Sequence, residues 1–361
     1  MGLFDKFSSQ KVPTAPVVAS TVVAGRGRQI DPVSAAAVDD ALAAVTDAAI
    51  RHANDPARAH RFEDGGPSAW SVASGPRGDT TLHVTYGLSG LVDRDPARGR
   101  IIYELAIQTR GPGVWWQLDV LRQLGAYLLT SGRDLAIGDY FPFHAPLPAA
   151  VLGPNRPPSE PDTHLTAIAV MPDPVLPVVH TPHGPLEIRR LYGVSNADFD
   201  LFESWSCRRF MGLVQQRDPE LVTDLTRGEW RDDPPLLAAC AAASADEGAE
   251  TGFFVVPGLR WEPTASGYRV VVPSAHAGQR IARMLDGRLR FGRALLVHGR
   301  DAGPGTAVGF APGGALDMRA DENTLHLALP SDSVLPNASY HGHTHTTSAP
   351  DGRTLVWDFA R

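Results

Sequence analysis

The sequence predicts an α+β protein with two mixed domains, a linker between them and a flexible N-terminal tail. At 361 residues the chain is longer than one hydrophobic core usually organises, which predicts two domains. Its 43% hydrophobic and 20% charged residues are typical of a folded protein and not of a disordered one. Strand-like and helix-like segments are interspersed without strict β-α alternation, which favours α+β over a doubly wound parallel sheet.

The N-terminal region begins without any structural periodicity. Residues 1–30 mix Ser, Val, Pro and Gly, which predicts a flexible tail. Asp31-Pro32 then opens a helix, because proline suits the first helical position and apolar residues follow at helical spacing. The turn residues Asn54-Asp55-Pro56 are expected to end this helix. We therefore place the start of the first domain at residue 31.

Further strands and helices are expected up to residue 230, which completes the first domain. Alternating or apolar runs bounded by Gly and Pro indicate strands, and apolar faces at helical spacing indicate helices. The expected strands cover residues 82–86, 100–107, 165–171 and 186–192, and the expected helices cover residues 116–132 and 196–214.

An Asp-, Ala- and Pro-rich stretch at residues 231–250 predicts a linker between the domains. The second domain then covers residues 251–361 and is expected to be mostly β. Its strand candidates are residues 253–256, 268–272, 294–298 and 325–329, with one helix near residues 275–285.

Charge and composition exclude several classes of function. The net charge of −7 and the pI near 6.0 argue against nucleic acid as a partner, because phosphate binding needs accumulated positive charge. No segment approaches the roughly 18 consecutive apolar residues of a membrane span. The two cysteines, Cys207 and Cys240, cannot form a disulfide framework and are expected to be packed in the interior. These features predict a cytoplasmic location.

A set of short segments stands out between residues 80 and 230. They are residues 83–89, 103–105, 116, 121–128, 131–132, 138–139, 171–174, 181–185, 192–194 and 222–225. In this order and spacing they resemble the Suppressor of fused family. Residues 286–293 resemble a segment in the C-terminal domain of its longer members, although Phe291 stands where the animal proteins carry His. The resemblance implies a bacterial relative of the two-domain form.

This resemblance implies a binding protein and not an enzyme. Animal members hold a short extended peptide of a transcription factor between their two domains, partly as an added strand. The family's contacting Tyr, Asp and His fall on Tyr127, Asp139 and His144. Tyr140 and Phe141 lie beside them and are expected to line a partner groove, with the hydrophobic core as the alternative.

The expected partner is another protein or an extended peptide. Bacterial relatives resemble immunity proteins that neutralise toxins, so a toxin is one expected partner, and a sequestered regulatory protein is the other. The resemblance implies no cofactor.

Three alternating histidines near the C-terminus suggest a different class of function. In a strand, His341, His343 and His345 would share one face, and three imidazoles can bind zinc with an open catalytic position. A metal-dependent hydrolase is therefore the alternative to the binding protein. No Asp or Glu lies among these histidines, and a polar strand face or loop is the competing interpretation. No motif of a serine hydrolase, phosphate loop or zinc protease occurs, so we assign no catalytic residue.

Overall fold

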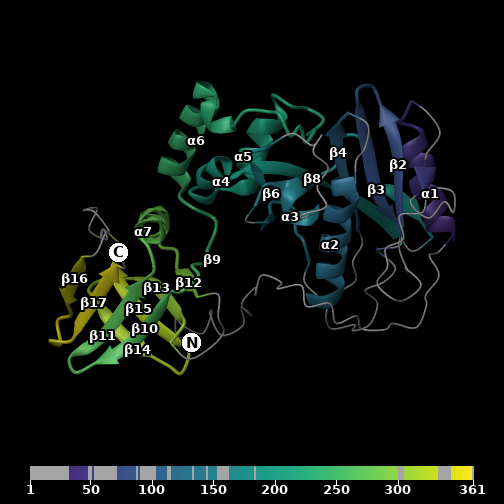
Figure 1. The fold of residues 1–361 in the computed structure, drawn as a ribbon. Coiled ribbons are helices and arrows are strands. Elements are labelled where there is room, and N and C mark those ends of the chain that lie inside the picture. Colours follow the sequence, from purple (N-terminus) through teal and green to yellow (C-terminus); the bar gives the residue numbers. More distant parts are fainter. Residues whose placement is uncertain are drawn as a thin grey trace. The chain divides into compact units, whose positions relative to one another are not determined.

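The computed structural model describes residues 32–47, 51–52, 71–86, 88–89, 103–111, 115–131, 134–143, 145–152, 162–182, 184–299, 305–331 and 343–359. The expected tail of residues 1–30 lies outside these described residues. The chain forms two compact units, whose elements are labelled in Figure 1. The N-terminal unit contains the described residues of 18–200 and 207–237, and the C-terminal unit contains residues 201–206 and the described residues from 238 onward.

The stretch predicted as a linker, residues 231–250, contains regular structure. A short 3-10 helix, η4 (Trp230–Asp232), leads into the helix α6 (Pro234–Glu247). Proline suits the first position of a helix, and the alanines that follow have high helix propensity.

An eight-stranded sheet organises the N-terminal unit. Its order is β1-β2-β3-β4-β8-β6-β5, with β7 paired to β8. The β4 and β8 strands are parallel, and the other neighbours are antiparallel. The strands are β1 (Arg51–His52), β2 (Ser71–Arg77), β3 (Thr80–Tyr86), β4 (Tyr103–Arg110), β5 (Tyr140–Pro142), β6 (Leu165–Pro172), β7 (Val179–Thr181) and β8 (Gly184–Ser195).

Helices cover both faces of this sheet. The α1 helix (Pro32–Ala43) packs on one face, where Val38 and Leu42 join a core cluster with Ala106 of β4. The α2 helix (Trp115–Ser131) packs on the other face, in a cluster that includes Leu105 and Ile107 of the same strand. Successive side chains of a strand point to opposite faces, so β4 contributes to both clusters and is buried along nearly its whole length.

Two predicted helices of this region have different limits from those expected. The α1 helix ends at Ala43 and not near residue 54, because the chain then turns and the Asp47 N–H donates to the Pro76 carbonyl of β2 at 2.8 Å. The single helix predicted at residues 196–214 is interrupted by a turn. It forms α4 (Asn196–Glu203) and α5 (Cys207–Gln215). A further short helix, α3 (Leu147–Leu152), precedes β6.

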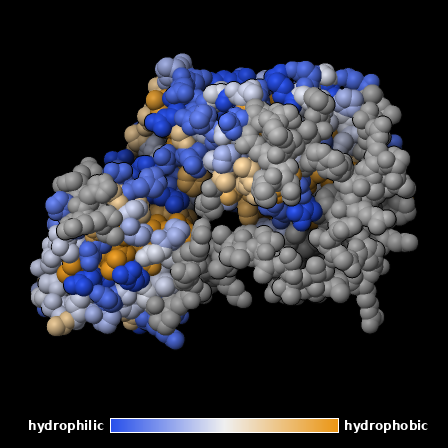
Figure 2. Space-filling model, viewed as in Figure 1, coloured by the Kyte–Doolittle hydropathy of each residue, from blue (hydrophilic) through white to orange (hydrophobic). Residues whose placement is uncertain are grey.

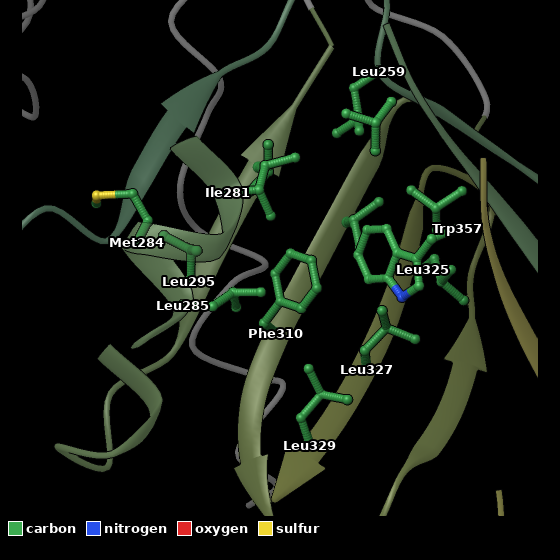
Figure 3. Close-up of a cluster of buried hydrophobic side chains, with 14 of the residues drawn as sticks. Leu259, Ile281, Met284, Leu285, Leu295, Phe310, Leu325, Leu327, Leu329 and Trp357 are labelled. Atoms are coloured by element: carbon green, nitrogen blue, oxygen red, sulfur yellow. The ribbon is translucent and has the colours of Figure 1, made fainter. Parts of the chain in front are cut away.

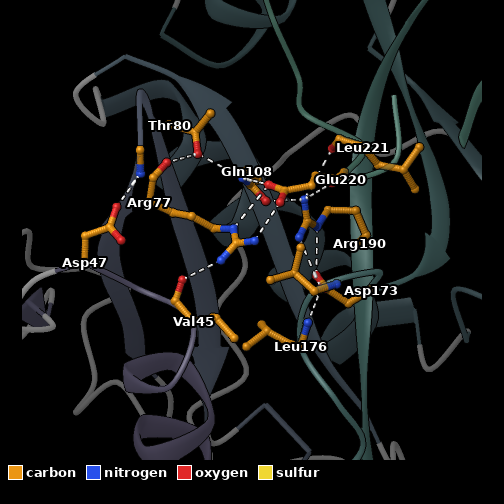
Figure 4. Close-up of polar contacts among 12 residues, drawn as sticks. Val45, Asp47, Arg77, Thr80, Gln108, Asp173, Leu176, Arg190, Glu220 and Leu221 are labelled. Atoms are coloured by element: carbon orange, nitrogen blue, oxygen red, sulfur yellow. Dashed lines mark hydrogen bonds and ion pairs between the residues drawn. The ribbon is translucent and has the colours of Figure 1, made fainter. Parts of the chain in front are cut away.

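A buried ion pair joins β8 to the end of β6 (Figure 4). The side chains of Arg190 and Asp173 are both fully buried, and Arg190 Nε donates to Asp173 Oδ2 at 2.7 Å. Arg190 Nη1 also donates to Gln108 Oε1 at 2.9 Å and to the Glu220 carbonyl at 2.7 Å. The Glu220 carboxylate in turn accepts two hydrogen bonds from Arg77. Directional bonds therefore fix the segment after α5 against the sheet.

The C-terminal unit contains two smaller sheets and the helix α7 (Ala275–Leu289). One sheet has the order β10-β11-β17-β16, and the other has the order β14-β15-β13-β12-β9. The strands are β9 (Phe253–Val255), β10 (Arg260–Thr264), β11 (Gly267–Val272), β12 (Leu295–His298), β13 (Ala307–Gly313), β14 (Asp317–Ala320), β15 (Thr324–Pro330), β16 (Thr344–Ser348) and β17 (Thr354–Phe359).

One apolar cluster holds these two sheets and α7 together (Figure 3). Phe310 of β13 and Trp357 of β17 stack at 6.1 Å between ring centroids, and Ile281 and Leu285 of α7 join the same cluster. On the face seen in Figure 2, the hydrophobic residues of this unit form small patches among hydrophilic ones. Packing of apolar side chains in the interior therefore defines this unit.

Candidate functional site

The candidate partner site lies where the chain passes from α2 to the edge strand β5. Tyr127 belongs to the last turns of α2, and a short turn at residues 134–139 leads into β5. Tyr140 and Phe141 are the first two residues of β5, which pairs on one side with β6. The structure therefore brings four of the predicted site residues to one corner of the sheet: Tyr127, Asp139, Tyr140 and Phe141.

Aromatic rings cluster at this corner on the α2 side of the sheet. The Tyr127 and Phe141 rings meet edge to face at 5.1 Å between centroids, and Phe141 meets Phe143 at 5.3 Å. All three side chains are half-buried and pack against the core cluster under α2. We call these three residues the aromatic cluster. The cluster is neither sealed in the interior nor fully exposed. Its position is therefore compatible with both expected alternatives, the hydrophobic core and a partner groove.

Tyr140 points to the opposite face of β5. Its ring meets Phe199 of α4 edge to face at 4.7 Å. Successive residues of a strand alternate between faces, so Tyr140 and Phe141 cannot line the same surface of this sheet. His144, the remaining predicted site residue, lies outside the described residues.

Asp139 closes the turn before β5. The Gly138 N–H donates to the Val170 carbonyl at 2.8 Å, and the Val170 N–H donates to the Asp139 carbonyl at 2.9 Å. The Asp139 carboxylate accepts the Ala136 N–H at 2.8 Å. Burial raises the pKa of Asp139, and the nearby charge of Asp134 raises it further, while Arg189 acts in the opposite direction. Asp139 is thus a half-buried acid beside the aromatic cluster.

Arg189 of β8 binds the first residues of this turn. Its guanidinium lies over the Tyr103 ring, 3.6 Å from the centroid, and only 8% of the residue is exposed. Arg189 Nη1 donates to Asp134 Oδ1 at 2.9 Å and also to the Leu135 carbonyl. The Tyr103 hydroxyl accepts the Leu135 N–H at 3.1 Å. Arg189 and Tyr103 therefore fix the start of the turn that carries Asp139.

The conformation of the turn also requires glycine. Gly138 has a φ of +92°, in the left-handed region that other residues rarely adopt. A Cβ atom at this position would lie 2.9 Å from Cβ of Arg208 in α5. Backbone conformation and close packing thus account for the glycine of the Gly138-Asp139 motif.

The sequence did not indicate the supporting residues Asp134 and Arg189. Tyr103 belongs to one of the family-like segments, but nothing local to it points to an arginine 86 positions later. The Arg189 guanidinium stacks on the Tyr103 ring because the sheet places β4 and β8 side by side as parallel neighbours.

Other family-like segments are brought together inside the N-terminal unit. The Gly193 N–H donates to Thr223 Oγ1 at 2.9 Å. A Cβ atom on Gly193 would lie 2.8 Å from Cγ2 of Thr223 and 2.9 Å from Cδ1 of Leu165. Asp198, Arg227 and Trp230 form a second set of bonds nearby, with 2.8 Å between Arg227 Nη2 and Asp198 Oδ2. Gly193 and Thr223, which belong to the family-like segments, therefore support the fold of the unit.

The terminal histidines do not form a metal site in the part of the chain that the structure describes. His343 and His345 are exposed, and His341 lies outside the described residues. Among the described residues, no group of three His, Cys, Asp or Glu side chains is placed to hold a metal ion. Cys207 and Cys240 are both buried. Within the described ranges, no helix has the length and apolar character needed to cross a membrane.

Comparison with known proteins gives a consistent result for the fold. The family model for the Suppressor of fused protein matches residues 66–228. The resemblance to this family is confirmed. Drosophila Suppressor of fused has a similar crystal structure, with a TM-score of 0.62 at 14% identity, covering 91% of this chain and 97% of that chain. The predicted α+β architecture with two mixed domains is confirmed by this likeness.

Two further solved structures are less similar. One is described as the Sufu-Fu complex, with a TM-score of 0.43 and 18% identity over 59% of this chain and 97% of that chain. The other is a Suppressor of fused homologue from Neisseria gonorrhoeae, with a TM-score of 0.38 and 8% identity over 55% of this chain and 96% of that chain. No curated protein sequence matches this chain.

Proposed function

We propose that the chain is a non-enzymatic protein of the Suppressor of fused type that binds another protein or an extended peptide. The observation that carries this proposal is the corner at α2 and β5. There, Tyr127 and Phe141 form a half-buried aromatic surface next to Asp139. The match of residues 66–228 to the family model supports the same kind of role.

The chemistry of this corner fits one kind of peptide segment. An apolar side chain of the partner would pack on the aromatic cluster, and a cationic or histidine side chain would pair with Asp139. The β5 strand is an edge of the sheet, but it is only three residues long and ends in Pro142, which has no N–H to donate, so backbone pairing with an extended segment would be limited to one or two bonds. Both affinity and selectivity would then come mainly from the aromatic cluster and the acid.

The pKa of Asp139 makes this binding depend on pH. Burial raises the pKa of this carboxyl, so it takes up a proton at a higher pH than an exposed aspartate does. A protonated Asp139 has no charge to offer a cation. Binding should therefore weaken as the pH falls toward the raised pKa, and an Asp139→Asn variant should lose this dependence.

We also propose which class of protein this chain binds. A toxin neutralised by this chain as an immunity protein is our first choice, and a sequestered regulatory protein is the second. Both use the same surface and require no covalent chemistry. A toxin gene next to the gene for this chain would favour the first, and rescue of cells that express that toxin would test it directly.

A pull-down with the purified full chain tests the site. The wild type should recover a defined protein from extracts of its source cells, and Tyr127→Ala and Asp139→Asn should each weaken its binding at least about tenfold. Asp286→Asn, an exposed acid of α7, serves as the matched control and should bind like the wild type. Unchanged binding by both site variants would show that the partner uses another surface.

A further inference from the structure

The edges of the two sheets in the C-terminal unit differ in how they are protected. Natural edge strands avoid pairing with other chains by carrying charges or proline, or by being very short. The β10 edge carries Arg260, Glu262 and Pro263, and β14 carries Asp317 and Arg319. The β9 edge is only three residues long. Three of the four edges therefore follow the rule.

The fourth edge, β16, does not follow it. Its sequence is Thr-His-Thr-Thr-Ser, without lysine, arginine, acid, glycine or proline, and its residues are largely exposed. It pairs with β17 in a regular antiparallel register that has no bulge. No other strand in the described part of the chain pairs with its outer side, and Figure 1 shows it at the border of its sheet.

The hydrogen bonds around β16 show which backbone groups face outward. The Phe359 N–H donates to the His343 carbonyl, and the Ala349 N–H donates to the Arg353 carbonyl. Bonded pairs alternate along an antiparallel ladder, so residues 345 and 347 also bond to β17. Residues 344, 346 and 348 consequently direct their N–H and C=O groups away from the sheet.

This pattern is self-complementary. A second β16 strand, antiparallel about a two-fold axis at Thr346, would place Thr346 opposite its own copy and Thr344 opposite Ser348. Each of these residues directs its backbone outward, so the pairing would form about six hydrogen bonds. Their side chains share one face, where Thr–Thr and Thr–Ser pairs are favourable. Since the strand has no charged residue, two copies meet without repulsion.

We propose that β16 is a self-association edge, through which two copies of this chain join their four-stranded sheets into one continuous sheet. The occupant that fits is a second copy, because the register, the outward backbone groups and the lack of charge all match under two-fold symmetry. A five-residue edge gives a small interface, so the pairing is weak and depends on concentration. It is separate from the partner site, which lies in the other unit.

Sedimentation and light scattering of the full chain test this proposal. The mass should rise from the monomer value of 38.6 kDa toward twice that value as the concentration increases. Thr346→Lys places two ammonium groups against each other and should weaken association at least about tenfold. Thr346→Pro should have the same effect, since the N–H that it removes faces away from β17. Thr346→Val is the matched control and should associate like the wild type.

Hydrogen exchange adds a second measurement. In dilute protein, the amides of Thr344, Thr346 and Ser348 should exchange quickly, and they should slow down at high concentration. Slow exchange in the dilute monomer would show that the edge is covered within the chain, and would overturn the proposal. A monomer at every concentration would overturn it too, as would equal association of the wild type and Thr346→Lys.

Two further outcomes remain distinguishable. Loss of a bound partner protein in Thr346→Lys, with the wild type monomeric throughout, would assign the edge to that partner and contradict self-association. Tyr127→Ala should leave self-association unchanged, so failure of the partner site and failure of the edge give different results.

Discussion

The interiors of the two units are built in different ways. Besides its two apolar clusters, the N-terminal unit buries charged and polar side chains, among them His83, Glu104 and Arg190 of the sheet and Asp198 of α4. In the C-terminal unit, one apolar cluster fills the space between two sheets and α7. The C-terminal unit also buries some polar groups, such as Arg288, His298 and His326, but the Arg190–Asp173 ion pair, with both side chains fully buried, lies in the N-terminal unit. Directional bonds therefore weigh more in the N-terminal unit, and packing that tolerates swaps of similar volume weighs more in the C-terminal unit.

This difference bears on the partner site. Asp139 keeps its place because Arg189, itself largely buried, bonds to the start of the same turn and lies over Tyr103. A site built on bonded charges can be positioned closely, but it becomes sensitive to charge and pH. The N-terminal unit should therefore respond to both, and the C-terminal unit should respond mainly to changes of volume.

The largest effect is expected at the buried ion pair. Asp173→Ala would leave Arg190 buried without its counter-charge and would remove the acceptor of the Leu176 N–H. We expect a loss of about 3–5 kcal/mol in the free energy of unfolding, measured by urea denaturation. Asp232→Ala, at an exposed acid, should cost less than about 0.5 kcal/mol. Equal effects of the two variants would contradict a charge-dependent interior.

A core substitution should give a comparable or smaller loss in the C-terminal unit. Leu327 is fully buried in the apolar cluster, so Leu327→Ala should cost about 2–5 kcal/mol through lost contacts and a residual cavity. Leu327→Met keeps the volume and should cost less than about 1.5 kcal/mol. Urea unfolding of both variants checks the contrast, and a Met variant as unstable as the Ala variant would contradict it.

Acid should weaken the N-terminal unit through His83. Burial lowers the pKa of His83 from 6.5 to about 4, while the Ser74 hydroxyl lies 2.7 Å from Nδ1. The unfolded state then binds the proton more readily, so this contribution is complete above pH 6.5 and is lost as the pH falls toward 4. The loss amounts to about 3 kcal/mol.

The measurement is the free energy of unfolding between pH 4 and 7 for the wild type and His83→Gln. Glu104, whose pKa is raised by burial, acts in the opposite direction in both proteins, so the difference between them isolates His83. A variant with the same pH dependence as the wild type would refute the assignment.

The smallest effect is expected at a surface ion pair of the C-terminal unit. Glu262 and Arg269 are 3.1 Å apart on β10 and β11, and about half of each side chain is exposed. Glu262→Ala should therefore change the free energy of unfolding by less than about 0.5 kcal/mol. A loss above 1 kcal/mol in thermal or urea unfolding would show that this unit also depends on its charges.

Much of the N-terminal fold could be predicted from the sequence. The strands at β4 and β6 follow apolar runs and the helix α2 follows an apolar face at helical spacing. The family-like segments include Tyr127 and Asp139, whose role as a partner site stays a prediction. The stacking of Arg189 on Tyr103 could not be predicted, because it depends on β4 and β8 lying side by side. The break between α4 and α5 was also missed, since the apolar pattern continues across it.

The C-terminal unit was harder to predict because its strands are short and weakly patterned. The expected strands at β9, β11, β12 and β15 and the helix α7 are present. The β13 strand contains glycine and proline, and β16 has no apolar alternation, so neither has a strand signal. In α6, helix propensity of the alanines outweighs the linker-like composition.

Hydrogen exchange of the full chain with and without its recovered partner tests the central claim most directly. If the corner at α2 and β5 captures the partner, backbone amides of residues 134–143 should gain protection on binding, and this gain should disappear in Asp139→Asn. Unchanged exchange across residues 134–143 in a saturated complex, with protection elsewhere in the chain, would contradict the assignment of this site.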